Sequence, residues 1–348
     1  MTPPATERWP SLASRIAILT GSFTALLAAT ILLAANIGAE PVPLGVIMDS
    51  ARAWLSGAPI TRDAQLVYIF WQLRLPRVLL GAVVGSALAV SGGALQGLLM
   101  NPLADPYLVG VSAGAALGAS AAIVLHLGQL AGGAGKAVIA FGAGAVTMML
   151  VLWLARSQRR IERDAFILAG VVIGSFLWAL VTLLMTVAGA DLQTVIFWLM
   201  GNLYVQLDWS IVAVAALLVV VGSVGLYAYA RDLNLLSLGE EQARQLGVET
   251  ESLKTGVIML SALITAAAVS VSGIIGFVGL VVPHMARRLF GPDHRLLLPV
   301  AGLMGASFLV WADTLARAIS EMFPVGVLTA ILGAPFFFYL LKTRPRPA

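Results

Sequence analysis

The stretch LPRVLLGAVVGSALAVSGGALQGLL, residues 75–99, carries a single charged side chain, Arg77, along its whole length. About 20 apolar residues are enough for an α-helix to cross the hydrocarbon core of a bilayer. Apolar residues run continuously here, whereas a strand of a membrane barrel alternates apolar and polar residues. The stretch therefore predicts a membrane-spanning helix.

The rest of the chain has the same character. Of its 348 residues, 11% are charged and 59% are hydrophobic, whereas a soluble domain has roughly 25% charged and 45–50% apolar residues. The absence of cysteine excludes disulfides and thiolate metal sites. Positive residues lie in loops between apolar runs, which is a membrane pattern and does not suggest a nucleic-acid partner. The sequence predicts an all-α polytopic membrane protein with one transmembrane domain, residues 1–348.

Ten apolar runs are predicted to span, which gives about ten transmembrane helices. Two amphipathic segments, 44–57 and 191–204, are predicted to lie at the lipid interface. The first run exceeds the roughly 7–15 apolar residues of a cleaved signal peptide, so it is predicted to be retained. The boundary between the seventh and eighth runs stays open. The predicted spans are 16–37, 75–99, 107–127, 136–155, 165–189, 209–230, 255–273, 276–290, 296–317 and 324–341.

Glycines spaced by four indicate close helix packing. A helix places such residues on one face, where a neighbouring helix can approach. Examples are Gly81–Gly85, Gly110–Gly114–Gly118 and Gly170–Gly174.

The lysines and arginines predict the orientation. With the N-terminus inside, fifteen of the 21 lie in inside loops and six in outside loops. Cytoplasmic loops retain positive residues, so both termini are predicted to be cytoplasmic, in a bacterial-type inner (cytoplasmic) membrane. This orientation also places residues 236–254 in the cytoplasm, between the sixth and seventh spans.

That segment, LSLGEEQARQLGVETESLK, concentrates charge in a chain that otherwise avoids it. The part LGEEQARQLGV predicts a short amphipathic helix that ends at Gly247, with Leu238, Ala243 and Leu246 on one face. An ordinary solvated loop helix is one interpretation. A lever that acts on both flanking spans is the other, and its position favours this one. The side chains predicted to point outward are Glu240, Glu241 and Arg244.

Signs of catalysis are absent from the sequence. GGAGKA (132–137) lacks the G-x-x-x-x-G-K-[ST] spacing of a phosphate loop, so no ATP site is predicted in this chain. The three histidines, His126, His284 and His294, have no ligand spacing and are interpreted as structural or solvated. We expect no catalytic residue, no metal and no cofactor, and therefore not an enzyme.

The charged segment contains E-x-A-x-x-L-G (Glu241 to Gly247), which is similar to the coupling segment of ABC-importer permeases. In those proteins the segment docks on the ATP-binding subunit. Other stretches, in order along nearly the whole chain, resemble FecCD-type permeases, which import iron–siderophores, haem and vitamin B12. These stretches are WQLRLPRVLLGAVVGSALAVSGGALQGLLMNPLADPYLVGVSAGAALG (71–118), LAGVVIG (168–174), LGEEQARQLGV (238–248), GIIGFVGLVVPHMARRLFGPDHRLLLP (273–299) and PVGVLTAILGAPFFFYLL (324–341).

The resemblance implies a mechanism. Two copies of the chain form a homodimer around a shared pathway, two ATP-binding subunits hydrolyse ATP, and a periplasmic or lipid-anchored binding protein delivers substrate. It implies an iron(III) chelate, siderophore or haem, as substrate, with cobalamin as the alternative. An ion-coupled secondary transporter is less favoured, because it would need several buried carboxylates and the spans offer essentially one, Asp313.

The resemblance also implies roles for particular residues. Gly239 and Gly247 would shape the turns around the coupling helix, and Ala243 and Leu246 would seat it. The residues expected to dock on the ATP-binding subunit are Gly239, Glu240, Glu241, Ala243, Arg244, Leu246 and Gly247.

Three outer arginines, Arg74, Arg77 and Arg317, are expected to dock the binding protein, with snorkelling at helix ends as the alternative. Asp313 is interpreted as the partner of Arg317, four residues on.

Asn101 and Leu103 match the family's cytoplasmic gate. Glu162, Arg163 and Asp164 occupy a second gate segment, which is small and hydroxyl-rich in the vitamin B12 permease. These charges are interpreted either as a salt-bridge latch or as side chains facing the cytoplasm, and we favour the second.

Overall fold

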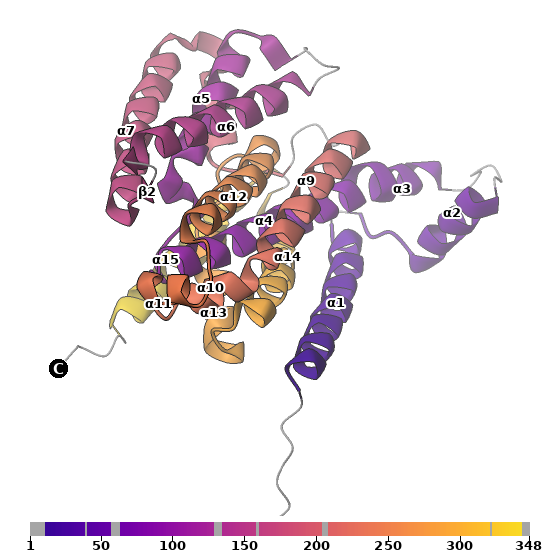
Figure 1. Ribbon diagram of the computed structural model, residues 1–348. Coiled ribbons are helices and arrows are strands. Elements are labelled where there is room, and N and C mark those ends of the chain that lie inside the picture. The colour runs from indigo at the N-terminus through magenta and orange to yellow at the C-terminus, as the bar shows by residue number, and fades with distance from the viewer. Residues whose placement is uncertain are drawn as a thin grey trace, which may run out of the picture.

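The computed structural model describes residues 11–38, 40–56, 63–128, 134–157, 160–203, 208–320 and 322–342. Within these ranges one helix corresponds to each predicted span (Figure 1). Seven helical segments are long and apolar enough to cross a membrane, and α5 and α15 are shorter apolar helices. The all-α membrane class is thus confirmed. In chain order the elements are α1 (Leu12–Asn36), α2 (Leu44–Ser56), α3 (Ala64–Tyr68), the π-helix η1 (Ile69–Arg74), α4 (Leu75–Leu98), the 3-10 helix η2 (Pro106–Val109), α5 (Val111–Val124), α6 (Gly135–Ala155), β1 (Arg156–Ser157), β2 (Arg160–Ile161), α7 (Arg163–Val187), the 3-10 helix η4 (Gly189–Asp191), α8 (Leu192–Leu199), α9 (Trp209–Ala228), α10 (Ala230–Leu236), α11 (Glu240–Gln245), α12 (Thr250–Ser272), α13 (Val278–Phe290), α14 (His294–Ile319) and α15 (Val325–Lys342).

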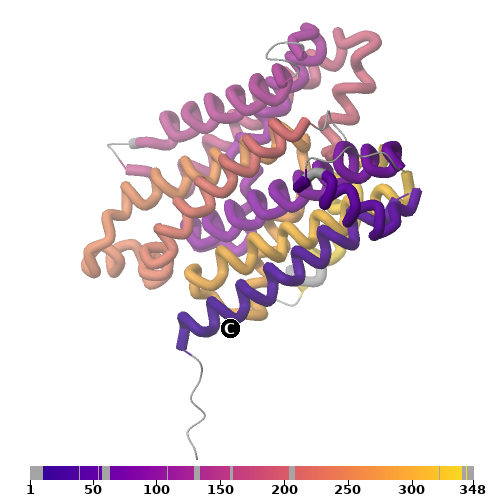
Figure 2. The backbone as a smooth tube through the Cα atoms, turned by 90° about the vertical axis from the view of Figure 1, so that its right-hand side faces the viewer, coloured from indigo at the N-terminus to yellow at the C-terminus, as the bar shows by residue number. Residues whose placement is uncertain are grey.

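The core of the bundle is formed by α4, α12 and α14, most of whose residues are buried. Across the bundle the helices follow the order α1, α14, α4, α12 and α6, and each contacts the next (Figure 2). The outer helices α1, α6, α7 and α9 expose large apolar side chains. Lipid is the natural solvent for that surface, because each helix satisfies its own backbone hydrogen bonds.

Glycine permits the closest helix contacts, as the four-residue spacing predicts. A Cβ on Gly85 of α4 would collide with the carbonyl of Gly305 in α14, and one on Gly114 of α5 with Thr147 of α6. Gly174 differs, because a Cβ there would meet nothing within 4 Å. The glycine pattern therefore predicts the packing of α4 and α5 and is wrong for Gly174 within this subunit.

Several boundaries differ from the predicted spans. The third span was expected from residue 107, but Gly110 has φ +81° and separates η2 from α5. The seventh span begins at Thr250, so the end of the charged segment is the first turn of α12. The open boundary after it falls at Gly273, where φ is +68°. Two short strands, β1 and β2, pair antiparallel before α7, and no apolar pattern in the sequence predicts them.

The helix α1 begins and α15 ends on the side of the bundle that carries α10 and α11 (Figure 1). The opposite side carries α2 and α3. This arrangement is the one required if both termini and the charged segment lie in the cytoplasm, as the positive residues predict. Of those residues, Arg8, Arg62, Arg159, Arg344 and Arg346 lie outside the described residues.

The crossing of α4 and α14 should be sensitive to side-chain size. We expect Gly85→Val to lower the thermal stability of the purified subunit in detergent, since overpacking costs about 1–3 kcal/mol. Gly142→Ala is the control, because a Cβ at Gly142 in α6 would meet nothing within 4 Å. Equal melting temperatures for the two variants would contradict the close approach of α4 and α14.

Candidate functional site

The predicted coupling helix is present as α11, a short helix between two turns (Figure 1). Gly239 precedes it with φ +117° and Gly247 follows it with φ +88°. Both values lie where side chains other than glycine are strained. This backbone agrees with the prediction that the two glycines shape the turns.

The side chains of α11 point in directions that the sequence analysis assigned wrongly. Ala243 is fully buried, whereas Leu238 and Leu246 are more than half exposed, so these three do not share a face. Of the charged residues, Glu241 is exposed but Glu240 and Arg244 are half-buried and point toward α12. The prediction is wrong because an amphipathic pattern places every polar side chain toward water. A polar side chain that has ionic partners within the protein can instead point inward.

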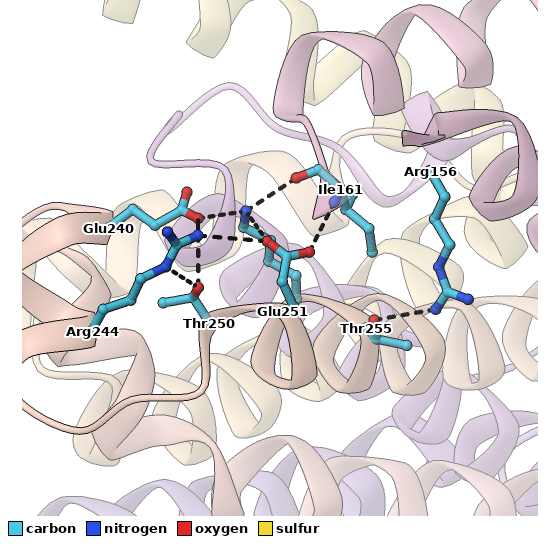
Figure 3. Close-up of polar contacts among 8 residues, drawn as sticks. Arg156, Ile161, Glu240, Arg244, Thr250, Glu251 and Thr255 are labelled. Carbon is cyan, nitrogen blue, oxygen red and sulfur yellow. Dashed lines mark hydrogen bonds and ion pairs between the residues drawn. The ribbon is translucent and has the colours of Figure 1, made fainter. Parts of the chain in front are cut away.

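Those internal partners form one ionic cluster, shown in Figure 3. Glu240 Oε1 accepts from Arg244 Nη2 at 2.6 Å and from Lys254 Nζ at 2.8 Å. Lys254 Nζ also donates to Glu251 Oε1 at 2.9 Å, and Arg244 Nε donates to Thr250 Oγ1 at 2.9 Å. The cluster therefore joins α11 to the first turn of α12. Sequence reasoning missed it, although the three-residue spacing of Glu251 and Lys254 is that of an ion pair on one helix face.

The cluster also sets the ionisation of Glu240. Partial burial alone would raise its pKa, but the hydrogen bond from Lys254 and the charges of Lys254, Arg244 and Arg163 outweigh it and hold the pKa below its ordinary value. The carboxylate therefore stays charged at neutral pH, and its contribution to stability is lost only as the pH falls below the ordinary glutamate range.

An open depression of about 790 Å³ lies beside the cluster. The second predicted gate segment, Glu162 to Asp164, lines it together with α11 residues. Glu162 and Asp164 are exposed and Arg163 is half-buried. No ion pair of these three is recorded among the described residues, which favours the cytoplasm-facing interpretation. The fold thus brings the predicted gate segment next to the predicted coupling helix.

The first predicted gate segment lies at the same end of the bundle, after α4. The Oδ1 of Asn101 accepts from the N–H of Leu103 at 3.0 Å, which closes a tight turn there. Nearby, Asn234 Oδ1 lies 2.7 Å from Nδ1 of His294, and its Nδ2 donates to Asp293. The histidine is buried and joins α10 to α14, as the structural interpretation expects. A gate function of Asn101 and Leu103 stays a prediction.

Two of the three outer arginines, Arg77 and Arg317, lie in a second ionic cluster at the opposite end. Arg77 Nη2 lies 2.8 Å from Asp313 Oδ1, and Arg317 Nε lies 3.1 Å from Asp313 Oδ2. Arg317 also donates to the carbonyls of Ala34 and Ile37 at the end of α1. The predicted pairing of Asp313 with Arg317 is confirmed. The bond from Arg77 was not predicted.

Two of these arginine side chains are almost fully buried, which limits their contact with a binding protein. The side chains of Arg77 and Arg317 are 5% and 9% exposed, and Arg74 donates to the carbonyl of Glu40 at 2.6 Å. All three are held by groups of this subunit, and Arg77 crosses to α14 instead of snorkelling at the end of α4. Contact with a binding protein stays a prediction.

A helical bundle of this apolar composition, with seven segments of the described residues long enough to cross a membrane, defines a multi-pass membrane protein. The chain belongs to the FecCD transport family, whose model matches residues 26–343. It is therefore a permease subunit of the ABC importer type.

Relatives with different substrates match almost the whole chain. The cobalamin import system permease of Halobacterium salinarum is 40% identical over 92% of this chain and 94% of its own. The hemin transport system permease of Yersinia pestis is 41% identical over 93% and 95%, and the molybdate import system permease of Haemophilus influenzae is 35% identical over 93% and 95%. A solved ABC transporter in an inward-facing conformation has a TM-score of 0.80 at 32% identity, covering 94% of this chain and 100% of that one.

Asp313 should be essential to stability. Asp313→Ala leaves two buried guanidinium groups without their carboxylate, and breaking a buried pair costs about 3–5 kcal/mol. We expect a large drop in the melting temperature of the detergent-solubilised subunit. The control is Asp49→Ala, because Asp49 pairs with Arg52 at 3.7 Å with both side chains more than 70% exposed, and such pairs contribute roughly 0–1 kcal/mol. If both variants melt together, the outer cluster does not stabilise the fold.

Proposed function

We propose that two copies of this chain form the translocation pathway of an ATP-driven, binding-protein-dependent importer in the inner membrane of a bacterial-type cell, and that the pathway carries an iron(III) chelate. Two separate ATP-binding subunits supply the energy. Cobalamin is the alternative substrate.

The observation that carries the proposal is the surface of α11. Its charges Glu240 and Arg244 are half-buried and paired with each other, while Leu238 and Leu246, which flank the helix, are 60% and 58% exposed on the side predicted to be cytoplasmic. Protein interfaces combine apolar side chains with polar ones at the rim, and the exposed residues at α11 include both kinds, Leu238 and Leu246 beside Glu241. The surface therefore fits docking of an ATP-binding subunit.

The structure of the outer side gives less support to the proposed docking of a binding protein than α11 gives to that of an ATP-binding subunit. Arg74, Arg77 and Arg317 remain the proposed docking residues, but acidic groups of a binding protein would have to compete with Asp313 and with backbone carbonyls for them. On the inner side, the turn at Asn101 and Leu103 and the segment from Glu162 to Asp164 remain the proposed gate.

The substrate is supported by the relatives alone. Hemin and iron dicitrate systems include permeases 41% and 37% identical to this chain, which supports an iron chelate. The 40% identical cobalamin permease supports the alternative.

The apolar surface of α11 gives a direct test. Leu246→Asp replaces an exposed apolar side chain at the end of α11 by a charge, and we expect loss of co-purification with the cognate ATP-binding subunit, as for deletion of residues 240–246. The matched control is Leu55→Asp in α2, which is 78% exposed on the opposite side of the bundle. A Leu246→Asp subunit that still co-purified would exclude α11 as the docking site.

The substrate is tested with the complete complex in proteoliposomes, with the cognate binding protein outside and ATP inside. Ferric siderophore, haem and cobalamin are offered separately, and internal iron or cobalt is measured by mass spectrometry. We expect vanadate-sensitive accumulation of iron. Accumulation of cobalt alone would make cobalamin the substrate in place of the iron chelate. Accumulation of neither metal would reject both proposed substrates.

A further inference from the structure

Both backbone polar atoms of Ile161, in β2, are held by side chains of α12. The N–H of Ile161 donates to Glu251 Oε2 at 2.8 Å, and its carbonyl accepts from Lys254 Nζ at 3.0 Å (Figure 3). The side chain of Ile161 is 4% exposed and packs in the main core. The strand is therefore fixed to the first turn of α12 by its backbone as well as by its side chain.

The same ammonium group also holds α11. Lys254 is 6% exposed, and its Nζ contacts the carboxylates of Glu240 and Glu251 as well as the carbonyl of Ile161. Hydrogen bonds of an ionised group are roughly twice as strong as neutral ones. One buried cation therefore connects the coupling helix with β2.

The strand leads directly into α7. Ile161 is followed by Glu162, the residue that precedes α7, and the carbonyl of Glu162 accepts from the N–H of Phe166 at 2.9 Å. Phe166 is 1% exposed and anchors the first turn. A displacement of β2 therefore reaches the start of α7 without an intervening loop. Further along, α7 packs on α5 and α6 and exposes a long apolar face.

We propose that Glu251 and Lys254 are positioning residues that transmit displacement of α11 to the start of α7, through the backbone of Ile161. The inference rests on the proposed function, because it takes α11 as the element moved by the ATP-binding subunits. Neither residue contacts substrate in this role. They make the coupling helix and the gate segment move together.

The test compares transport with ATP hydrolysis in the complete complex with its binding protein. Lys254→Met keeps an unbranched side chain and removes the ammonium, and Glu251→Ala removes the acceptor for the N–H of Ile161. For both we expect ATP hydrolysis close to wild type and about tenfold less substrate transported per ATP, within the usual range of coupling between sites. Lys254→Arg should restore much of the ratio.

Thr255→Val is the matched control. Thr255 accepts from Arg156 Nη2 at 3.4 Å, so it also joins the β1–β2 pair to α12, but by a long, exposed contact (Figure 3). The control should keep the wild-type ratio. An unchanged ratio in Lys254→Met and Glu251→Ala, or hydrolysis and transport falling in parallel, would overturn the inference.

A second measurement needs no variant. In the wild-type complex, hydrogen–deuterium exchange is compared between the nucleotide-free and the vanadate-trapped state. Peptides covering residues 160–166 and 240–246 should change their protection together. A change at 240–246 with none at 160–166 would overturn the inference while α11 docking still stands. Failure of the wild-type chain to bind an ATP-binding subunit would instead reject the proposed function.

Discussion

A charge that leaves water in this protein has to meet an opposite charge or a backbone dipole, and that constraint organises both ends of the bundle. An isolated ion in a medium of low dielectric is costly, so buried charges occur in hydrogen-bonded groups. At one end Asp313 is shared by Arg77 and Arg317, and the latter also binds the end of α1. At the other end Lys254 is shared by two carboxylates and a carbonyl. Each cluster connects elements far apart in the sequence.

The helices could be predicted because apolar length is a local property. The run 75–99 is long enough to span whatever surrounds it, and the structure confirms it as α4. The pairing of Asp313 with Arg317 could be predicted for the same reason, since four residues separate them on one helix. The boundaries at Gly110 and Gly273 could not be predicted from apolar length, because they depend on backbone conformation.

The partners of the charges could not be predicted, because they depend on tertiary contacts. Arg77 and Asp313 are 236 residues apart in sequence. The contact between Lys254 and Ile161 spans 93 residues and uses a backbone carbonyl, which no side-chain pattern records. For this reason the sequence predicts an outward direction for all the charged residues of α11. Two of them, Glu240 and Arg244, are instead half-buried and paired with each other.

In the proposed mechanism, the chain has no energy source of its own and is moved by an ATP-hydrolysing partner that binds α11. The most direct measurement is uptake against a gradient by proteoliposomes that contain this chain alone, compared with proteoliposomes that also contain its ATP-binding subunits, ATP and the binding protein. The account predicts accumulation only in the complete system, whatever proton or sodium gradient is imposed on the isolated chain. Uphill accumulation by the isolated chain under an ion gradient would contradict it.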